Sequence, residues 1–191
     1  GDRVLEATAH YQIAQLDLNN DNYIDAINGY TKVIEEYSDT EIVRDAHYGR
    51  ALSYHKANRF SRALSDYEWL LEQNLPESMK LKVEFAKALS HAAEGQDDQA
   101  RELLSKVIDS GDETLARNAQ LQMISMAEKQ DPQEAVRTYA DMLTRLRTQE
   151  DRVRVLIRLA SAYFRLGQYD QSVEASQQLL DVAVDANDIA N

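Results

Sequence analysis

A polar stretch near the start of the chain has the composition of a calcium-binding loop. In DLNNDNYIDAIN, which spans residues 17–28, oxygen-bearing side chains recur at short intervals: Asp17, Asn19, Asp21 and Asp25. Alternating acids and amides of this kind coordinate calcium in a known loop pattern. The two most demanding places do not match, because Asn22 replaces the glycine of the sharp turn and Asn28 replaces the bidentate glutamate. The pattern alone therefore does not predict a calcium site.

The other residue types that carry chemistry do not form a catalytic or metal-binding pattern. Cysteine is absent, which excludes thiolate metal sites and a cysteine nucleophile. There are four histidines, and although His47 and His55 lie eight residues apart, no ligating residue at four-residue spacing completes a set between them. No glycine-rich phosphate loop and no G-x-S-x-G elbow occurs. The sequence predicts a non-enzymatic protein with no cofactor and no metal.

The composition favours a helical protein that does not bind nucleic acid. Hydrophobic residues make up 43% of the 191 residues, and Gly and Pro number only 6 and 2. The net charge of −12 disfavours a general phosphate-binding surface. No apolar run is long enough for a membrane span. The charge is uneven, because residues 17–41 are rich in acids whereas residues 145–165 hold six arginines.

Four series of positions repeat along the chain, each with steps of 37, 37, 35 and 37 residues. The first series is mostly small: Ala14, Ala51, Ala88, Met123 and Ala160. The second is Ala26, Ala63, Ala100, Ala135 and Ser172. The third is Tyr30, Tyr67, Leu104, Tyr139 and Ser176. The fourth is Val33, Leu70, Val107, Met142 and Leu179. A shared irregular set of steps indicates an internal repeat.

The spacing within each unit predicts a helix, a turn and a second helix. The first small residue lies 12 positions before the second, and turn-forming residues such as Asn58, Gly95 and Gly167 stand between them. We expect the two backbones to approach closely at the small residues. Asp112 is predicted to cap a helix after Gly111, and Pro132 to begin one with Asp131 as its cap.

This pattern resembles the tetratricopeptide repeat family. The clearest unit is LIRLASAYFRLGQYDQSVEASQQLL, residues 156–180, and GRALSYHKANRFSRALSDYEWLLEQ, residues 49–73, is nearly as good. Ser172 and Ser176 depart from the usual alanine and aromatic, and the fourth unit is the weakest. The resemblance implies an all-α, right-handed superhelix (α-solenoid) of ten helices in one domain. Its repeats would span about 4–38, 40–75, 77–110, 112–148 and 150–182.

The repeat is longer than the usual 34 residues of this family. The surplus lies between units, in EEYSDTEIVRDAHYGRAL, and is similar to the longer repeats of bacterial cell-envelope proteins of the outer-membrane assembly and Tol–Pal-associated families. This resemblance implies a periplasmic or envelope-associated protein, with the cytoplasm as the alternative. The chain opens at Gly1 without Met, so we expect a segment of a longer protein, and residues 183–191 are expected to begin a sixth unit.

The resemblance implies that the first helices line a concave groove that binds a peptide or helix of a protein partner. The candidate binding residues are Tyr11, Gln15, Tyr48, Leu52, His55, Phe85, Leu89, Ile124, Arg154, Arg158, Phe164 and Arg165. Leu18, Gln120 and Ile157 fall on the same stripes. Aromatics and arginines are frequent in binding hot spots, and Arg154 and Arg158 could fork onto a partner's carboxylates. The alternative is that the apolar candidates pack between neighbouring helices and the arginines are ordinary surface.

One known ligand class of the family is not implied, and two other functional hypotheses stay open. The lysine and asparagine clamp that some family members use for a chaperone's acidic tail is not matched, because its places hold Tyr11, Gln15, Tyr48 and Leu52. Self-association through end-to-end stacking or dimers is the second hypothesis, and an accessory region of a larger enzyme or machine is the third.

The repeat register also reinterprets the calcium-like stretch. Tyr23 and Ala26 belong to the series continued by Phe60 and Ala63 and by Tyr169 and Ser172, so Ile24 and Asp25 should lie inside a helix. The stretch is predicted to be the turn of the first hairpin, with Asn22 able to adopt a left-handed conformation and the acids and amides capping the next helix.

Overall fold

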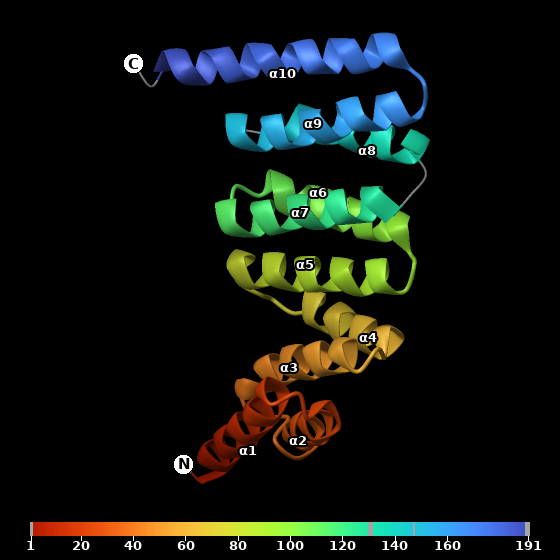
Figure 1. Ribbon diagram of the computed structural model, residues 1–191. Helices are drawn as coiled ribbons and strands as arrows, with labels where there is room; N and C mark the ends of the chain where they lie inside the picture. The colour runs from red at the N-terminus through yellow and green to blue at the C-terminus, as the bar shows by residue number, and fades with distance from the viewer. Residues whose placement is uncertain (1, 130–131, 147, 190–191) are drawn as a thin grey trace. The chain divides into compact units, whose positions relative to one another are not determined.

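The computed structural model describes residues 2–129, 132–146 and 148–189, without the side chains of residues 2 and 183–189. These residues form ten α-helices and no strand (Figure 1). The helices are α1 (Asp2–Asn19), α2 (Tyr23–Glu36), α3 (Ile42–Lys56), α4 (Phe60–Leu71), α5 (Glu77–Ala93), α6 (Asp97–Asp109), α7 (Glu113–Lys129), α8 (Pro132–Arg145), α9 (Gln149–Arg165) and α10 (Tyr169–Ile189). The predicted all-α fold of helix–turn–helix repeats is confirmed.

The chain divides into two compact units, Gly1–Val107 and Ile108–Asn191. Each is described separately below. The expectation of one continuous array depends on how the two units are placed, and it stays a prediction. The sixth repeat was expected at residues 183–191, whose side chains lie outside the described part of the chain; the backbone of α10 continues without a break to Ile189.

The turn inside the hairpin has the same backbone geometry in four of the five repeats. A residue with positive φ stands five positions before the small residue of each second helix, and these residues are Asp21 (61°), Asn58 (57°), Gly95 (80°) and Gly167 (72°). The following amide donates to the carbonyl five residues earlier, at 2.8–3.0 Å, in the pairs Asn22–Asp17, Arg59–Tyr54, Gln96–His91 and Gln168–Tyr163. This is the Schellman arrangement that satisfies the last carbonyls of a helix.

The calcium-like stretch is one of these turns. Helix α2 begins at Tyr23, so Ile24 and Asp25 are helical as predicted. The expected left-handed residue was wrong: Asn22 has a φ of −81°, and Asp21 takes the positive φ because α1 ends at Asn19. The expected capping was also wrong, because the side chain of Asn22 makes no capping hydrogen bond.

The loop between α6 and α7 and the start of α8 agree with the sequence predictions that can be examined. Gly111 has a φ of 87°, and the Asp112 carboxylate accepts the Leu115 amide at 2.9 Å, which caps α7. Helix α8 begins at Pro132. The predicted cap of that helix, Asp131, lies outside the described residues.

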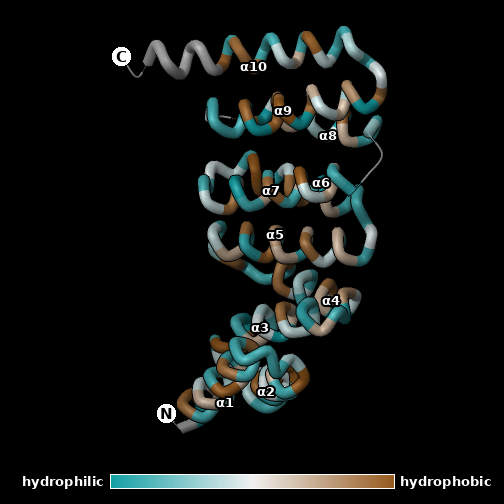
Figure 2. The backbone as a smooth tube through the Cα atoms, in the orientation of Figure 1, coloured by the Kyte–Doolittle hydropathy of each residue, from teal (hydrophilic) through white to brown (hydrophobic). Residues whose placement is uncertain are grey.

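Small residues bring the two helices of each hairpin together, as predicted. Both small positions are completely buried in the hairpins of Ala14 with Ala26, Ala51 with Ala63, and Ala88 with Ala100. In the last hairpin the Ser172 hydroxyl donates to the Ala160 carbonyl at 2.9 Å, so serine serves the same close approach with a hydrogen bond. Polar and apolar residues are interspersed along the coloured helices (Figure 2), and the second helices α2, α4, α6 and α8 are strongly amphipathic.

The first two hairpins of the first unit are each also covered by the first helix of the next hairpin. Tyr30 and Val33 of α2 share a buried cluster with Ala46 of α3. Tyr67 of α4 is buried in the same way with Val83 of α5. The third and fourth repeat series therefore form the core between successive hairpins, which is how repeat proteins distribute their stability.

Gly49 of α3 tests this packing, because its backbone lies against the fully buried ring of Tyr30. A Cβ added at Gly49 would overlap the ring carbon Cζ. We expect Gly49→Ala to lower the free energy of unfolding by about 1–3 kcal/mol through overpacking, despite the better helix propensity of alanine. Urea denaturation followed by circular dichroism measures this. Lys56→Ala, on the exposed end of the same helix, should change stability by less than about 0.5 kcal/mol. Equal stability of the two variants would contradict the packing argument.

Candidate protein-binding surface

Three aromatic residues occupy equivalent positions on the first helices of the first unit. Tyr11, Tyr48 and Phe85 each lie three residues before the small residue of α1, α3 and α5. Helix α3 contacts both α1 and α5, so these first helices lie next to one another. All three rings are half-buried and keep an accessible part. The sequence-predicted residues of this unit therefore lie on neighbouring helices, and we call them the first-helix surface: Tyr11, Gln15, Tyr48, Leu52, His55, Phe85 and Leu89.

Gln15 fixes the orientation of the tyrosines at the α1 end of this surface. Its Oε1 accepts hydrogen bonds from the Tyr30 hydroxyl at 3.2 Å and the Tyr11 hydroxyl at 3.4 Å. The Tyr11 ring tilts against that of Tyr30, with centroids 5.6 Å apart. Burial, followed by the nearby Asp45 carboxylate, raises the pKa of Tyr11. The hydroxyl is thus a neutral hydrogen-bonding group held close to an acidic side chain.

His55 connects α3 to α5. Its Nδ1 lies 2.8 Å from the Ser90 hydroxyl, and its ring packs edge-on against Phe60. Burial and the Lys56 ammonium lower the pKa of His55 below 6.5, so the imidazole is neutral at physiological pH. Tyr48 and Leu52 pack partly against the second buried cluster. These side chains therefore serve both predicted purposes, because they pack between neighbouring helices and also keep accessible surface.

A hollow of about 620 Å³ lies near the N-terminal ends of α1, α3 and α5. It is lined by Val4, Thr8, Glu41, Ile42, Arg44, Asp45, Leu75, Pro76 and Met79. The sequence analysis missed these residues. The available signal was the helical spacing, since steps of three and four residues backward from Tyr11 and Tyr48 lead to Thr8, Val4, Asp45 and Glu41.

The predicted residues of the second unit differ in their accessibility. Ile124 is only 4% exposed, so its side chain belongs to the core and not to a surface open to a partner. Phe164 is 63% exposed, and its ring contacts Tyr169 edge-on with centroids 5.5 Å apart. Arg165 is exposed on the same turn of α9.

The two arginines that were expected to fork onto a partner already have acidic neighbours. Arg154 pairs with Glu150 at 3.0 Å and with Asp151 at 3.2 Å. Arg158 pairs with Glu128 at 3.0 Å. The predicted basic character of residues 145–165 is therefore largely neutralised inside the unit, because acids one helical turn away or on α7 reach the guanidinium groups.

A buried polar network in the first unit was not found from the sequence. Asp66 of α4 accepts two hydrogen bonds from Arg50, at 2.7 and 2.8 Å, and its Oδ1 lies 2.8 Å from His47 Nδ1. The Trp69 indole stacks on the His47 ring at 3.7 Å. Burial opposes ionisation of Asp66, but the hydrogen bonds from Arg50 and His47 hold its pKa below the usual range. This network joins α3 to α4, and a single aspartate on a helix gives no sequence signal for it.

The described helices offer accessible surface for contact with another molecule. The described residues include no cluster of three or more metal-ligating side chains. No helix among them is long and apolar enough to cross a membrane. Paired helices whose first members offer half-buried aromatics define the class of helical-repeat interaction scaffolds, a fold that is typically non-catalytic.

The chain belongs to the tetratricopeptide repeat family. One family model described as tetratricopeptide repeat matches residues 11–78 and 48–114, and a second matches residues 153–183. The two ranges of the first model together span residues 11–114, which is more than half of the chain. The interval between the matched ranges contains the fourth repeat, which is the one that departs furthest from the family pattern.

Solved structures show the same fold at low sequence identity. A putative kinesin light chain with TPR-like repeats from Podosopora anserina has a TM-score of 0.59 and 19% identity, covering 95% of this chain and 96% of that one. MamA protein has a TM-score of 0.61 and 14% identity over 92% and 91%. The C-terminal part of a TPR protein from Cytophaga hutchinsonii has a TM-score of 0.59 and 18% identity over 90% and 64%. No curated protein sequence matches the chain.

The buried network gives a stability prediction. Asp66→Ala leaves Arg50 and His47 without their shared acceptor, and we expect it to lower the free energy of unfolding by about 3 kcal/mol. Glu68→Ala is the matched control, since Glu68 pairs with Lys87 from a side chain that is 59% exposed, and it should cost less than about 1 kcal/mol. Chemical denaturation of both variants makes the comparison. A similar small loss for both would show that the network contributes little.

Proposed function

We propose that the first unit binds an extended peptide or an amphipathic helix of a protein partner on its first-helix surface. The chain is a protein-interaction scaffold by family, and this proposal says where the interaction occurs. The observation that carries it is the hollow lined from α1, α3 and α5, because its lining residues Thr8 and Asp45 lie one helical turn before the half-buried Tyr11 and Tyr48. A surface that combines apolar area with fixed hydroxyl groups suits a peptide ligand.

The charges of the hollow indicate the kind of peptide. Glu41 and Asp45 line it, with Arg44 between them in the sequence. Val4, Ile42 and Met79 supply apolar contact area. The whole chain carries a net charge of −12, which would attract a basic partner during encounter. A helix or peptide with apolar anchors and basic residues is therefore the expected ligand.

Peptides selected from a displayed random library against the whole chain provide the test. Tyr48→Ala with Phe85→Ala should weaken binding of a selected peptide at least about tenfold, because truncated aromatic hot spots typically cost more than 1 kcal/mol. Val4→Lys should weaken it too, because it replaces apolar contact area with a charge that repels a basic peptide; Val4 is exposed, so the packing stays intact. Calorimetry measures the affinities and circular dichroism monitors the fold. Leu180→Ala, a change at an exposed apolar residue of the second unit, should have no effect. Undiminished affinity in the Tyr48, Phe85 and Val4 variants would refute the site.

The exposed predicted residues of the second unit extend the same proposal. Phe164 and Arg165 offer an aromatic and a cation to a partner. Arg154 and Arg158 could contribute only by exchanging their present carboxylates for those of the partner. We therefore place the main contact on the first unit. A setting in a bacterial envelope complex is a finer form of the proposal, supported by the repeat length alone, and the sequence of the full-length protein would decide it.

Self-association is a second candidate, and the repeat register favours it. Leu16 of α1 is 61% exposed, whereas the equivalent Ser53, Ser90 and Ala162 are completely buried. Val173 of α10 is 69% exposed, whereas three of its four equivalents are buried: Ile27, Leu64 and Val136. The fourth equivalent, Arg101, is half-buried. The helices that carry these buried equivalents are packed in pairs: α2 against α3, α4 against α5 and α8 against α9. Helix α10 of one copy could dock on α1 of another, and this head-to-tail contact would build an open assembly.

Sedimentation and light scattering over a range of concentrations test this assembly. The average mass of the wild-type chain should rise with concentration. Leu16→Asp or Val173→Asp should each keep the chain monomeric, because both halves of the contact are needed. Leu121→Asp, a similar change at a residue that is 47% exposed on α7, should not alter the mass. A wild-type chain that stays monomeric at high concentration would eliminate this candidate.

A further inference from the structure

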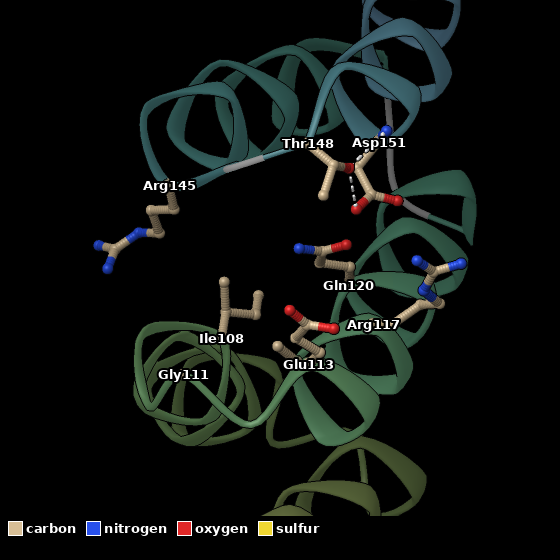
Figure 3. Close-up of a pocket in the computed structure, with 9 residues that line it drawn as sticks. Ile108, Gly111, Glu113, Arg117, Gln120, Arg145, Thr148 and Asp151 are labelled. Carbon is tan, nitrogen blue, oxygen red and sulfur yellow. Dashed lines mark hydrogen bonds between the residues drawn. The ribbon is translucent and has the colours of Figure 1, made fainter.

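A separate pocket of about 170 Å³ lies inside the second unit (Figure 3). It is formed by the last turn of α6, the first half of α7, the last turn of α8 and the start of α9. The lining residues are Ile108, Gly111, Glu113, Ala116, Arg117, Gln120, Arg145, Thr148 and Asp151. None of the residues in the partner-binding prediction lines it. The pocket has the size of one amino-acid side chain and not of a peptide.

Gln120 gives this pocket an unsatisfied polar group. The side chain is 7% exposed, and Figure 3 shows its amide extending into the space between Ile108 and Thr148. Its Oε1 is buried and has no hydrogen-bond partner among the described residues. A buried acceptor without a donor costs about 1–3 kcal/mol, which a ligand that donates a hydrogen bond would recover. A half-turn of the amide exchanges its oxygen and nitrogen, so the oxygen can face the cavity.

Further acceptors lie around the same space. Glu113 extends toward Gln120 from one side, and Asp151, which is 5% exposed, lies on the other side with Thr148 (Figure 3). The Asp151 carboxylate accepts the Thr148 hydroxyl at 2.6 Å and Arg154 at 3.2 Å. Each carboxylate oxygen has two lone pairs, so the carboxylate can accept further hydrogen bonds.

The two arginines of the lining do not make the pocket a site for anions. Arg145 extends away from Gln120 (Figure 3), and its guanidinium pairs with Asp109 at 2.6 Å and with Asp141 at 3.2 Å. Arg117 is exposed at the rim. The buried Asp151 carboxylate is an acceptor, and Gln120 offers a second acceptor to the cavity after the half-turn of its amide. The cations are either paired with acids or in solvent. A cationic donor suits this arrangement better than a carboxylate does.

We propose that this pocket binds the side chain of one lysine or arginine of the protein partner. The aliphatic stem would lie against Ile108 and Ala116, and the charged head would donate to Gln120 and Glu113. This inference rests on the proposed function in that the ligand is a protein, but it names a second contact in a different unit. The net charge of −12 favours a basic segment in both places.

Single amino-acid probes test the pocket without the first-helix surface. Nα-acetyl-arginine amide and Nα-acetyl-lysine amide, which keep their charged side chains, should shift NMR signals of the whole chain. The expected signals are those of the Gln120 side-chain amide and of the backbone at Glu113 and Thr148. The neutral N-acetyl-glutamine amide should not shift them. The relative affinities of the two cationic probes identify which head group the pocket prefers. The absence of pocket shifts with both cationic probes would overturn the proposal.

Matched variants separate binding from a structural role. Gln120→Met keeps the side-chain volume and removes the unsatisfied oxygen, so it should leave the melting temperature equal or raised while weakening the preferred probe at least fivefold. Glu113→Gln should also weaken it. Glu174→Gln, which makes the same charge change at an exposed residue of α10, should not. Unchanged probe affinity in Gln120→Met would refute the assignment.

The two proposals can fail independently. If library peptides bind and respond only to the Tyr48 and Phe85 changes while the probes do not bind, the pocket is wrong and the first-helix surface stands. If the probes bind but no peptide responds to the first-helix variants, the pocket stands and the proposed function is wrong. Selected peptides that contain an essential basic residue, and that lose affinity in Gln120→Met, would support both proposals.

Discussion

The fold depends on the close approach of two helices at a pair of small residues twelve positions apart. Ala14 and Ala26 illustrate it, since both are completely buried where α1 meets α2. The approach is possible only because the connecting turn takes a positive φ at a fixed position, which reverses the chain within three residues. Once the hairpin closes, the second helix still carries large residues such as Tyr30, which contacts Tyr11 of its own hairpin and also extends to Gly49 of the next first helix. These residues are buried only when the next first helix covers them, so each hairpin requires a neighbour.

That requirement also explains where functional surfaces can exist. The small residues and the large residues of the second helices are committed to packing, and substitutions there would reduce stability. The stripe of first-helix residues that includes Tyr11, Tyr48 and Phe85 is only half-buried, so it can vary without loss of the fold. Polar connections such as the Asp66 network fix the orientation of the helices that carry this stripe. Rigid helices with an adaptable face are what a scaffold needs to recognise a peptide.

The pocket of the second unit coincides with the most irregular part of the repeat. The step between the small residues shortens to 35 at Met123, where the other steps are 37. Gln120 stands at the position that holds Tyr11, Tyr48 and Phe85 in the first three repeats. A buried amide replaces an aromatic ring, and the shortened connection places Gly111 beside it. An internal repeat tolerates such a departure when the altered position has another use, which is the reason to assign a ligand to it.

The sequence alone determined the helices, their pairing, the turns and the core, because these follow from contacts between residues at fixed short separations. It also assigned the residues of the first-helix surface to first helices of the repeats, and they lie on α1, α3 and α5. It did not determine that Ile124 is buried, that Arg154 and Arg158 are already paired, or that Asp66 joins Arg50 and His47. Each of these depends on which side chains from different helices meet, and on how far each is removed from solvent. Periodicity fixes the face of a helix, but only the packed tertiary structure decides which polar groups on that face are satisfied.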